Sequence, residues 1–247
     1  MRISWKRLAA VSIWLILLLL SIFRFDLIEG PLNAAFGARQ VMRLRAPLYD
    51  YAWQHVQLVL VSTGLSLLIG LTLSLAVSLP LLSEFRRPLL SSVTFMQTVP
   101  STAVLALSVP LMGYGQLPVV MALVFYGLLP IVRNTIEGLD AVAPDVLLTA
   151  AGMGMTPAQR LTRVAWPLAL PAVLAGIRTS VIINISAATI GAAVGAGGLG
   201  VLIVNGIRSM DVTMILKGAL PVSLLALLTG SLFSLLEPAW RRRMAGA

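Results

Sequence analysis

The chain has few charges for its length and no cysteine. Only 11% of its 247 residues are charged, 58% are hydrophobic, and the mean hydropathy is +0.95. Soluble domains carry about 25% charged residues, so these values exclude an ordinary soluble enzyme, a disordered chain and a nucleic-acid-binding module. The lack of cysteine excludes disulfides, thiolate metal sites and a cysteine nucleophile. The composition indicates an all-α helical bundle that crosses the membrane several times.

The usual catalytic and nucleotide-binding motifs are also missing. The sequence contains no Gly-x-x-x-x-Gly-Lys-Ser/Thr phosphate loop, no His-Glu-x-x-His and no Gly-x-Ser-x-Gly. Residues 195–200 fit Gly-x-Gly-x-x-Gly, but they follow a hydrophobic run, so we interpret them as a tight external turn or a re-entrant segment. The single histidine, His55, is interpreted as an interfacial side chain. We therefore expect no catalytic centre, no metal site and no cofactor.

Six hydrophobic segments approach the length of about 20 residues that a spanning helix needs. They are residues 8–23, 56–82, 89–112, 117–132, 168–194 and 216–236. The first has the basic flank of a signal peptide but no nearby cleavage site, so we interpret it as a retained anchor. We expect an N-terminal anchor with a periplasmic loop (1–53), a transmembrane domain (54–239) and a basic tail (240–247).

The positions of the basic residues predict the orientation. With both termini in the cytoplasm, most of the 18 lysines and arginines fall on the cytoplasmic side, as membrane proteins prefer. We therefore expect an inner-membrane, multi-pass protein with both termini inside. The net charge of +9 is then a topology signal and does not indicate a nucleic-acid partner.

Two spans carry small or polar residues at every fourth position, which permits close helix contact in a bilayer. We interpret these stripes as packing within the chain; a subunit interface or a pathway lining is the alternative. The stripes are Ser62, Ser66, Gly70, Ser74 and Ser78 in one span, and Ala172, Gly176, Ser180, Asn184, Ala188 and Ala192 in the other.

Polar and helix-bending residues within the spans are candidates to line a translocation path, because polar groups inside a membrane usually face protein or water. Asn184 either lines the path or forms a hydrogen bond between helices. Arg178 either reaches the membrane surface, pairs with an acidic residue (Glu137 or Asp140) or contacts substrate. Prolines in 89–112 kink or break the helix, and broken helices often form transporter binding sites. The full candidate set is Gln97, Thr98, Pro100, Asn184 and Arg178.

The segment between the fourth and fifth spans, residues 133–167, is predicted to form two short helices joined by a glycine turn. Pro144 and Asp145 suit the start of the first helix. Gly152 and Gly154 permit the turn. The second helix is expected to begin at Thr156.

Thr156 and Gln159 have the spacing of a capping box around Pro157. Arg160 and Arg163 lie toward the far end of this second helix, and Pro167 is expected to end it. A DNA-binding helix-turn-helix is not favoured, because the segment is short and tethered between spans.

The same segment resembles the EAA loop of binding-protein-dependent ABC importer permeases. That pattern is Glu-Ala-Ala, three residues, Gly, nine residues, Ile-x-Leu-Pro; here it runs from 148 through Gly154 to 164–167. The family's glutamate is Leu148, its first alanine Thr149 and its leucine Trp166. The resemblance implies a coupling loop, about 140–167, that docks on a separate ATPase subunit. Its candidate residues are Asp145, Leu148, Thr149, Ala150, Gly152, Gly154, Thr156, Gln159, Arg160, Arg163 and Pro167.

Five further stretches are similar to permeases for osmoprotectants such as glycine betaine, choline and carnitine. The resemblance implies alternating access between two permease subunits, identical or related, with ABC ATPase subunits and an external substrate-binding protein as partners in the lipid bilayer. An importer for an amino acid or another small solute, and less favoured a self-sufficient secondary transporter, are the alternatives. The stretches are residues 97–101, 128–135, 152–156, 175–179 and 195–200.

Overall fold

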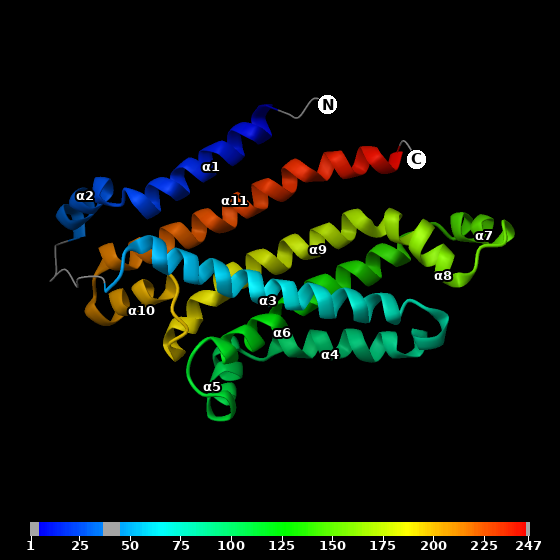
Figure 1. Cartoon of the computed structure of the whole chain (residues 1–247), viewed down its shortest axis with the longest axis horizontal. Helices are drawn as coiled ribbons and strands as arrows, with labels where there is room; N and C mark the ends of the chain where they lie inside the picture. The colour runs from blue at the N-terminus through cyan, green and yellow to red at the C-terminus, as the bar shows by residue number, and fades with distance from the viewer. Residues whose placement is uncertain (1–4, 37–44, 246–247) are drawn as a thin grey trace.

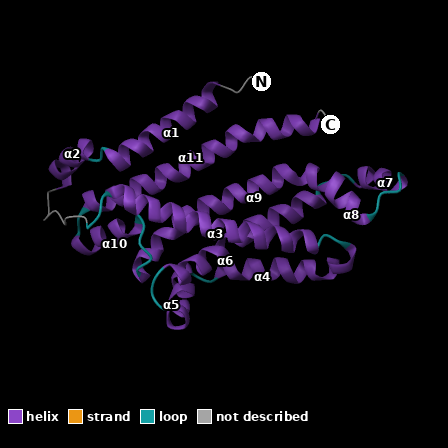
Figure 2. Ribbon diagram, in the orientation of Figure 1, coloured by secondary structure: helices purple, strands orange, loops and turns teal. Residues whose placement is uncertain are grey.

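The computed structural model describes residues 5–36 and 45–245, with side chains to residue 235. Residues 1–4, 37–44 and 246–247, from the expected anchor region and tail, lie outside this part. The described residues form helices and connecting loops, without a strand (Figure 2). The helices are α1 (Trp5–Phe23), α2 (Asp26–Phe36), α3 (Leu48–Ala76), η1 (Pro80–Phe85), α4 (Arg86–Thr98), α5 (Ser101–Met112), α6 (Gln116–Asp140), α7 (Pro144–Gly152), α8 (Pro157–Arg160), η2 (Leu161–Ala165), α9 (Trp166–Ala187), η3 (Ala188–Val194), α10 (Gly200–Ser209) and α11 (Val212–Ala245).

Five of the described helices are long and apolar enough to cross a membrane, and a bent pair would make a sixth. The five are α1, α3, α6, the continuous helix Pro157–Val194 and Val212–Leu235 of α11. The segment 89–112, expected as one span that its prolines kink or break, is divided into α4 and α5, which meet at 93°. Pro100 has no N–H to continue the helix, and it holds Val99 in an extended conformation (φ −76°, ψ 126°).

The long helices run back and forth along one axis, and their connections gather at two ends (Figure 1). The hairpin α7–α8 lies at one end, which we call the hairpin end; the turn between α3 and α4, the start of α1 and the finish of α11 lie toward the same end. Helices α2 and α10 lie at the opposite end, with α5 set across the bundle axis. Successive connections between the long helices therefore alternate between the hairpin end and the opposite end.

The centre of the bundle is formed by α3, α6 and α9, and the small-residue stripes face into it. Ser62, Ser66 and Ser180 are fully buried. A Cβ on Gly176 would lie 2.5 Å from the carbonyl oxygen of Pro130, so only glycine permits α9 to approach α6 this closely. The interpretation of the stripes as packing within the chain is confirmed.

Helices α2 and α3 occupy parts of the expected periplasmic loop. A loop was expected between the first two spans, 8–23 and 56–82, but α2 lies within it and α3 begins about two turns before residue 56, at Leu48. His55 therefore lies inside α3 and is fully buried, with Nε2 2.9 Å from the Ile185 carbonyl oxygen. The expectation of an interfacial side chain is wrong.

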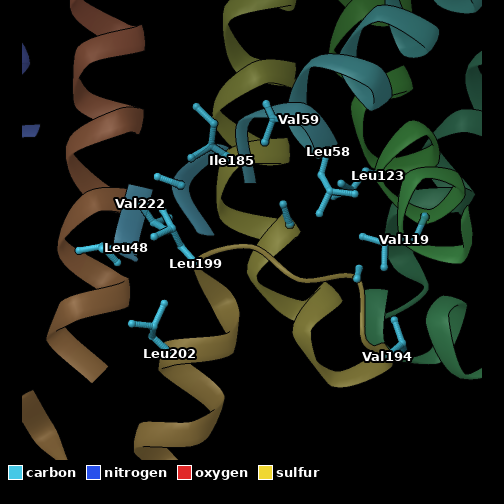
Figure 3. Packing of buried hydrophobic residues seen from close by; sticks show 14 of the residues in the cluster. Leu48, Leu58, Val59, Val119, Leu123, Ile185, Val194, Leu199, Leu202 and Val222 are labelled. Carbon is cyan, nitrogen blue, oxygen red and sulfur yellow. The ribbon is translucent and has the colours of Figure 1, made fainter. Parts of the chain in front are cut away.

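The glycine turn at 195–200 packs over His55. Gly195, Gly197 and Gly198 have φ values of +78°, +84° and +77°, which confirms the tight turn. The Gly198 N–H donates to Gln54 Oε1 at 3.1 Å. Apolar residues on either side complete this part of the core: Figure 3 shows Leu48, Ile185, Leu199 and Val222 converging from α3, α9, the turn and α11.

Candidate functional site

The α7–α8 hairpin is built by the local signals that the sequence carries. Pro144 occupies the first turn of α7, with Asp145 beside it. Gly154 makes the turn with φ +81°, a value that side chains rarely adopt. At the start of α8 the Thr156 N–H donates to Gln159 Oε1 (2.9 Å), and the Gln159 N–H donates to Thr156 Oγ1 (3.3 Å). The predicted helix–turn–helix and its capping box are confirmed.

The second helix of the hairpin does not end at Pro167, which corrects the expectation. The chain passes from α8 through a π-helical turn, Leu161–Ala165, directly into α9. In this turn the Trp166 N–H donates to the Leu161 carbonyl, five residues back. Pro167 lies in the first turn of α9 and has no backbone N–H to donate. The wider π turn before it accommodates the proline, so the helix continues without a break. The hairpin is therefore continuous with a membrane span.

One face of the hairpin is anchored and the other is exposed. Leu147 and Leu161 pack on a small cluster formed by Leu139, Val142, Ala165 and Ala169. Ala150 is also buried (2% exposed). Leu148 and Met153, by contrast, are 67% and 68% exposed. Thr149 and Asp145 share this accessible side, joined by a bond from Thr149 Oγ1 to the Asp145 carbonyl (2.8 Å). The hairpin thus presents an apolar surface on a rigid base.

The candidates from the third span gather where α4 meets α5. The Gln97 amide donates from Nε2 to the Tyr126 carbonyl on α6, at 2.8 Å. The Tyr126 hydroxyl donates to the carbonyl of Val99, within the break itself. Thr98 and Pro100 lie next to the break and are exposed. These contacts fix the bend of α4–α5 against α6 and leave Thr98 and Pro100 accessible.

Asn184 lies elsewhere, in the centre of the bundle. Its side chain is fully buried, and Nδ2 donates to Thr63 Oγ1 on α3 at 3.0 Å. Its Oδ1 and the neighbouring Ser180 Oγ are buried without a partner among the described residues. Of the two interpretations of Asn184, a bond between helices matches its position in this structure.

Arg178 lies on a third side, between α9 and α11, with its guanidinium beside Gly230. The proposed pairing with an acidic residue is wrong, because Glu137 is bound to Arg133 (2.7 Å) and Asp140 to Arg86. Among the described residues Arg178 makes no ion pair. The structure therefore brings Gln97, Thr98 and Pro100 together and separates them from Asn184 and Arg178.

Tyr126 is a contact residue that the sequence reasoning missed. A signal for it exists, because Pro130 follows four residues later and cannot donate to its carbonyl. Within the described residues, no group of three or more histidine, aspartate or glutamate side chains is placed to hold a metal.

The known proteins that this chain resembles in sequence include several transport permeases. The chain is 42% identical to the osmoprotectant import permease protein OsmW of Salmonella typhimurium, over 73% of this chain and 85% of that protein. It is 37% identical to the choline transport system permease protein OpuBB of Bacillus subtilis, over 78% of this chain and 89% of the relative. The glycine betaine/carnitine/choline transport system permease protein OpuCB of Bacillus subtilis is 36% identical over 74% of this chain and 84% of its own length.

The fold also matches a solved structure. An inward-facing conformation of the MetNI methionine ABC transporter gives a TM-score of 0.68 at 21% identity, over 76% of this chain and 93% of that chain. The family model described as "Binding-protein-dependent transport system inner membrane component" matches residues 66–242. The chain therefore belongs to this family, as a permease subunit of an ABC importer.

Proposed function

We propose that this permease imports a quaternary-ammonium osmoprotectant of the glycine betaine, choline or carnitine type. The observation that carries the proposal is that relatives named for these substrates match the chain over about three quarters of its length. An amino acid or another small solute is the alternative, since the methionine transporter shares the fold. Only 6% of the residues are aromatic, so an aromatic cage for the cation belongs to an external binding protein that delivers the substrate.

The hairpin end faces the cytoplasm in this proposal, with both termini on the same side. The described arginines and lysines support this orientation, because Arg86, Arg87, Arg133, Arg160 and Arg163 lie toward the hairpin end. The inner membrane is the location that follows.

The exposed hairpin surface docks on an ATPase subunit. Leu148 and Met153 offer apolar contacts, and the packed cluster beneath them keeps the hairpin attached to the span. Closure of two ATPase subunits, driven by ATP, moves the two hairpins of a permease pair together. Because α8 runs into α9 without a break, that movement is passed to the membrane helices and alternates access to the path.

The path forms between this permease and a second copy or a relative. Gln97, Thr98 and Pro100 at the α4–α5 break are its best-supported lining residues, because two of them are exposed there. Asn184, which bonds α9 to α3, and Arg178, between α9 and α11, are the weaker candidates. A self-sufficient secondary transporter is disfavoured, because the acidic residues of the described spans lie near helix ends: Asp50, Glu137 and Asp140.

The test is purification of the tagged chain from native membranes in a mild detergent, followed by assays for co-purifying subunits and ATP hydrolysis. We expect a stoichiometric ATPase, lost in Gly154→Val because a β-branched side chain strains φ +81°. Gly152→Ala is the matched control, since no atom lies within 4 Å of its Cβ position. A chain that purifies alone under several mild conditions contradicts the importer mechanism.

Substrate is tested separately, by uptake of radiolabelled glycine betaine, choline and carnitine into cells that carry the full transporter. Uptake of at least one that disappears with Gly154→Val supports the proposal. Uptake of methionine or another amino acid in place of all three establishes the alternative.

A further inference from the structure

A cavity of about 250 Å³ lies at the hairpin end, and its lining includes neither the residues of the α4–α5 break nor the exposed Leu148 and Met153. Its walls come from the turn between α3 and α4, the end of α6 and the hairpin, where α8 continues into η2. Pockets for drug-sized ligands measure about 300–1,000 Å³. The cavity is thus suited to a small ion or to the headgroup of a larger molecule.

Three charged residues line the cavity: Arg86, Asp140 and Arg160. Arg86 Nη2 binds the Asp140 carboxylate and also lies 3.3 Å from the Ile136 carbonyl oxygen. The Asp140 charge is therefore neutralised by Arg86, and the positive charge of Arg160 remains in excess. The cavity consequently favours an anion.

Arg160 also has an unused donor. Its Nε is buried and has no hydrogen-bond partner within the described part of the chain. A buried donor on a charged group costs free energy when it stays unpaired. Arg160 thus lacks both a counter-charge and a hydrogen-bond acceptor, and a single anionic oxygen ligand supplies both.

The two serine hydroxyls of the cavity are not free to donate to a ligand, so the arginine guanidinium groups are its donors. Ser78 Oγ already donates to the Ser74 carbonyl (2.7 Å), and Ser83 Oγ donates to the Pro80 carbonyl (2.9 Å). Their protons are therefore committed to the backbone. Arginine presents a planar set of donors that matches the oxygens of a phosphate group better than a single ammonium does.

We propose that this cavity binds a phosphate group, carried either by an anionic lipid headgroup or by a free phosphate ion, with Arg160 as its main ligand and Arg86 as the second. The cavity lies at the ends of membrane-spanning helices, the depth at which headgroups lie. A bound phosphate group joins the start of α4 (Arg86), which its ion pair with Asp140 ties to the end of α6, to the end of α8 (Arg160), and so fixes the base of the hairpin relative to the bundle.

The lipid arm of the test uses native mass spectrometry of the full chain with phosphatidylglycerol and, for comparison, phosphatidylcholine. The free-ion arm measures the melting temperature in detergent with sodium phosphate or sodium chloride at equal ionic strength. The variant is Arg160→Gln. Its control is Arg163→Gln. Arg163 lies about one turn after Arg160, is exposed and does not line the cavity, so this variant removes the same charge outside the site.

We expect one of the two probes, phosphatidylglycerol or phosphate, to bind the unaltered chain and Arg163→Gln alike. Arg160→Gln is expected to weaken that binding about tenfold or more, the effect of one charge-assisted hydrogen bond. Which arm responds identifies the source of the phosphate group. Arg160→Lys keeps the charge without the planar donors, so we expect intermediate binding; it replaces Arg160→Gln if that variant does not fold.

Equal binding by the Arg160 and Arg163 variants in both arms overturns the proposal. The proposal is also overturned if the unaltered chain retains phosphatidylglycerol and phosphatidylcholine equally and its melting temperature does not respond to phosphate. If Arg160→Gln releases an ATPase subunit while anion binding is unchanged, Arg160 serves a protein contact and the phosphate site is wrong. None of these outcomes bears on whether the chain imports an osmoprotectant.

Discussion

Gln97 donates its side-chain amide to the carbonyl oxygen of Tyr126, 2.8 Å away, and this is the oxygen that Pro130 leaves without a partner in its own helix. The Tyr126 hydroxyl donates in return to Val99, at the break between α4 and α5. A proline in α6 therefore creates the acceptor that holds the bent helix pair in place. The bend is fixed because a carbonyl left free in α6 and a carbonyl at the α4–α5 break each accept a hydrogen bond from the other element.

This relationship predicts that Gln97→Leu destabilises the bundle by about 1–2 kcal/mol, because the Tyr126 carbonyl loses its donor in a partly buried setting. Pro130→Ala in the same chain should recover part of the loss, since alanine restores the backbone N–H. The measurement is the melting temperature of both single variants and the double variant in one detergent. Strictly additive effects of the two substitutions would show that the carbonyl is not their point of contact.

Gly127→Ala is predicted to destabilise the centre of the bundle. An alanine Cβ there would lie 2.6 Å from Ser66 Oγ and 2.7 Å from Ser180 Oγ, and overpacking of this kind costs about 1–3 kcal/mol. Gly64→Ala is the matched control on α3: nothing lies within 4 Å of its Cβ, and alanine in a helix gains about 0.5–1 kcal/mol. Thermal unfolding should move in opposite directions for the two variants; a shared direction contradicts the packing of α6 against α3 and α9.

Removing the capping box should loosen the hairpin locally. In Thr156→Ala the Gln159 N–H loses its acceptor, at a cost of about 1 kcal/mol. Hydrogen exchange of residues 156–161 should accelerate about fivefold, the equivalent of that free energy, while exchange in α3 and α6 stays unchanged. Thr162→Ala is the control, because Thr162 Oγ1 only returns to the Ala158 carbonyl within the helical run. Equal acceleration in both variants would refute the capping role.

Leu148 tests the docking surface. Leu148→Arg places a charge on a residue that is 67% exposed, so the chain should fold normally but retain its ATPase subunit about tenfold less, since burying a leucine contributes about 1.5–3 kcal/mol. Leu81→Arg is the comparison, an exposed leucine (85%) in η1 near the same end. Co-purified ATPase is measured for each. If the two variants retain the ATPase equally, another part of the hairpin end makes the contact.

Local rules were sufficient for much of the fold. The hydrophobic runs located the spans, and the sequence around Thr156 predicted the hairpin because a cap depends on residues only three positions apart. The small-residue stripes predicted the centre of the bundle for the same reason, since a four-residue step keeps one face of a helix toward its neighbour.

The remaining features depend on contacts that are distant in the sequence. His55 is buried because the glycine turn near 198 covers it, more than a hundred residues later. The break at Pro100 was visible as a proline, but its 93° angle is held by Tyr126. Neither the pairing of Arg86 with Asp140 nor the cavity beside Arg160 leaves a pattern in the sequence, because the pair joins two distant segments and the cavity is lined by three.

The π turn at Leu161–Ala165 has a mechanical consequence. The helix from Pro157 to Val194 is unbroken for 38 residues, about 57 Å at a rise of 1.5 Å per residue. A lever of this length converts a small tilt at α8 into a larger displacement at the glycine turn, where Gly198 rests on His55. In the π turn the hydrogen bonds span five residues, and Ala188–Val194 at the far end of the lever is 3-10 helical, so flexing should concentrate at these two stretches while the α-helical part between them stays stiff.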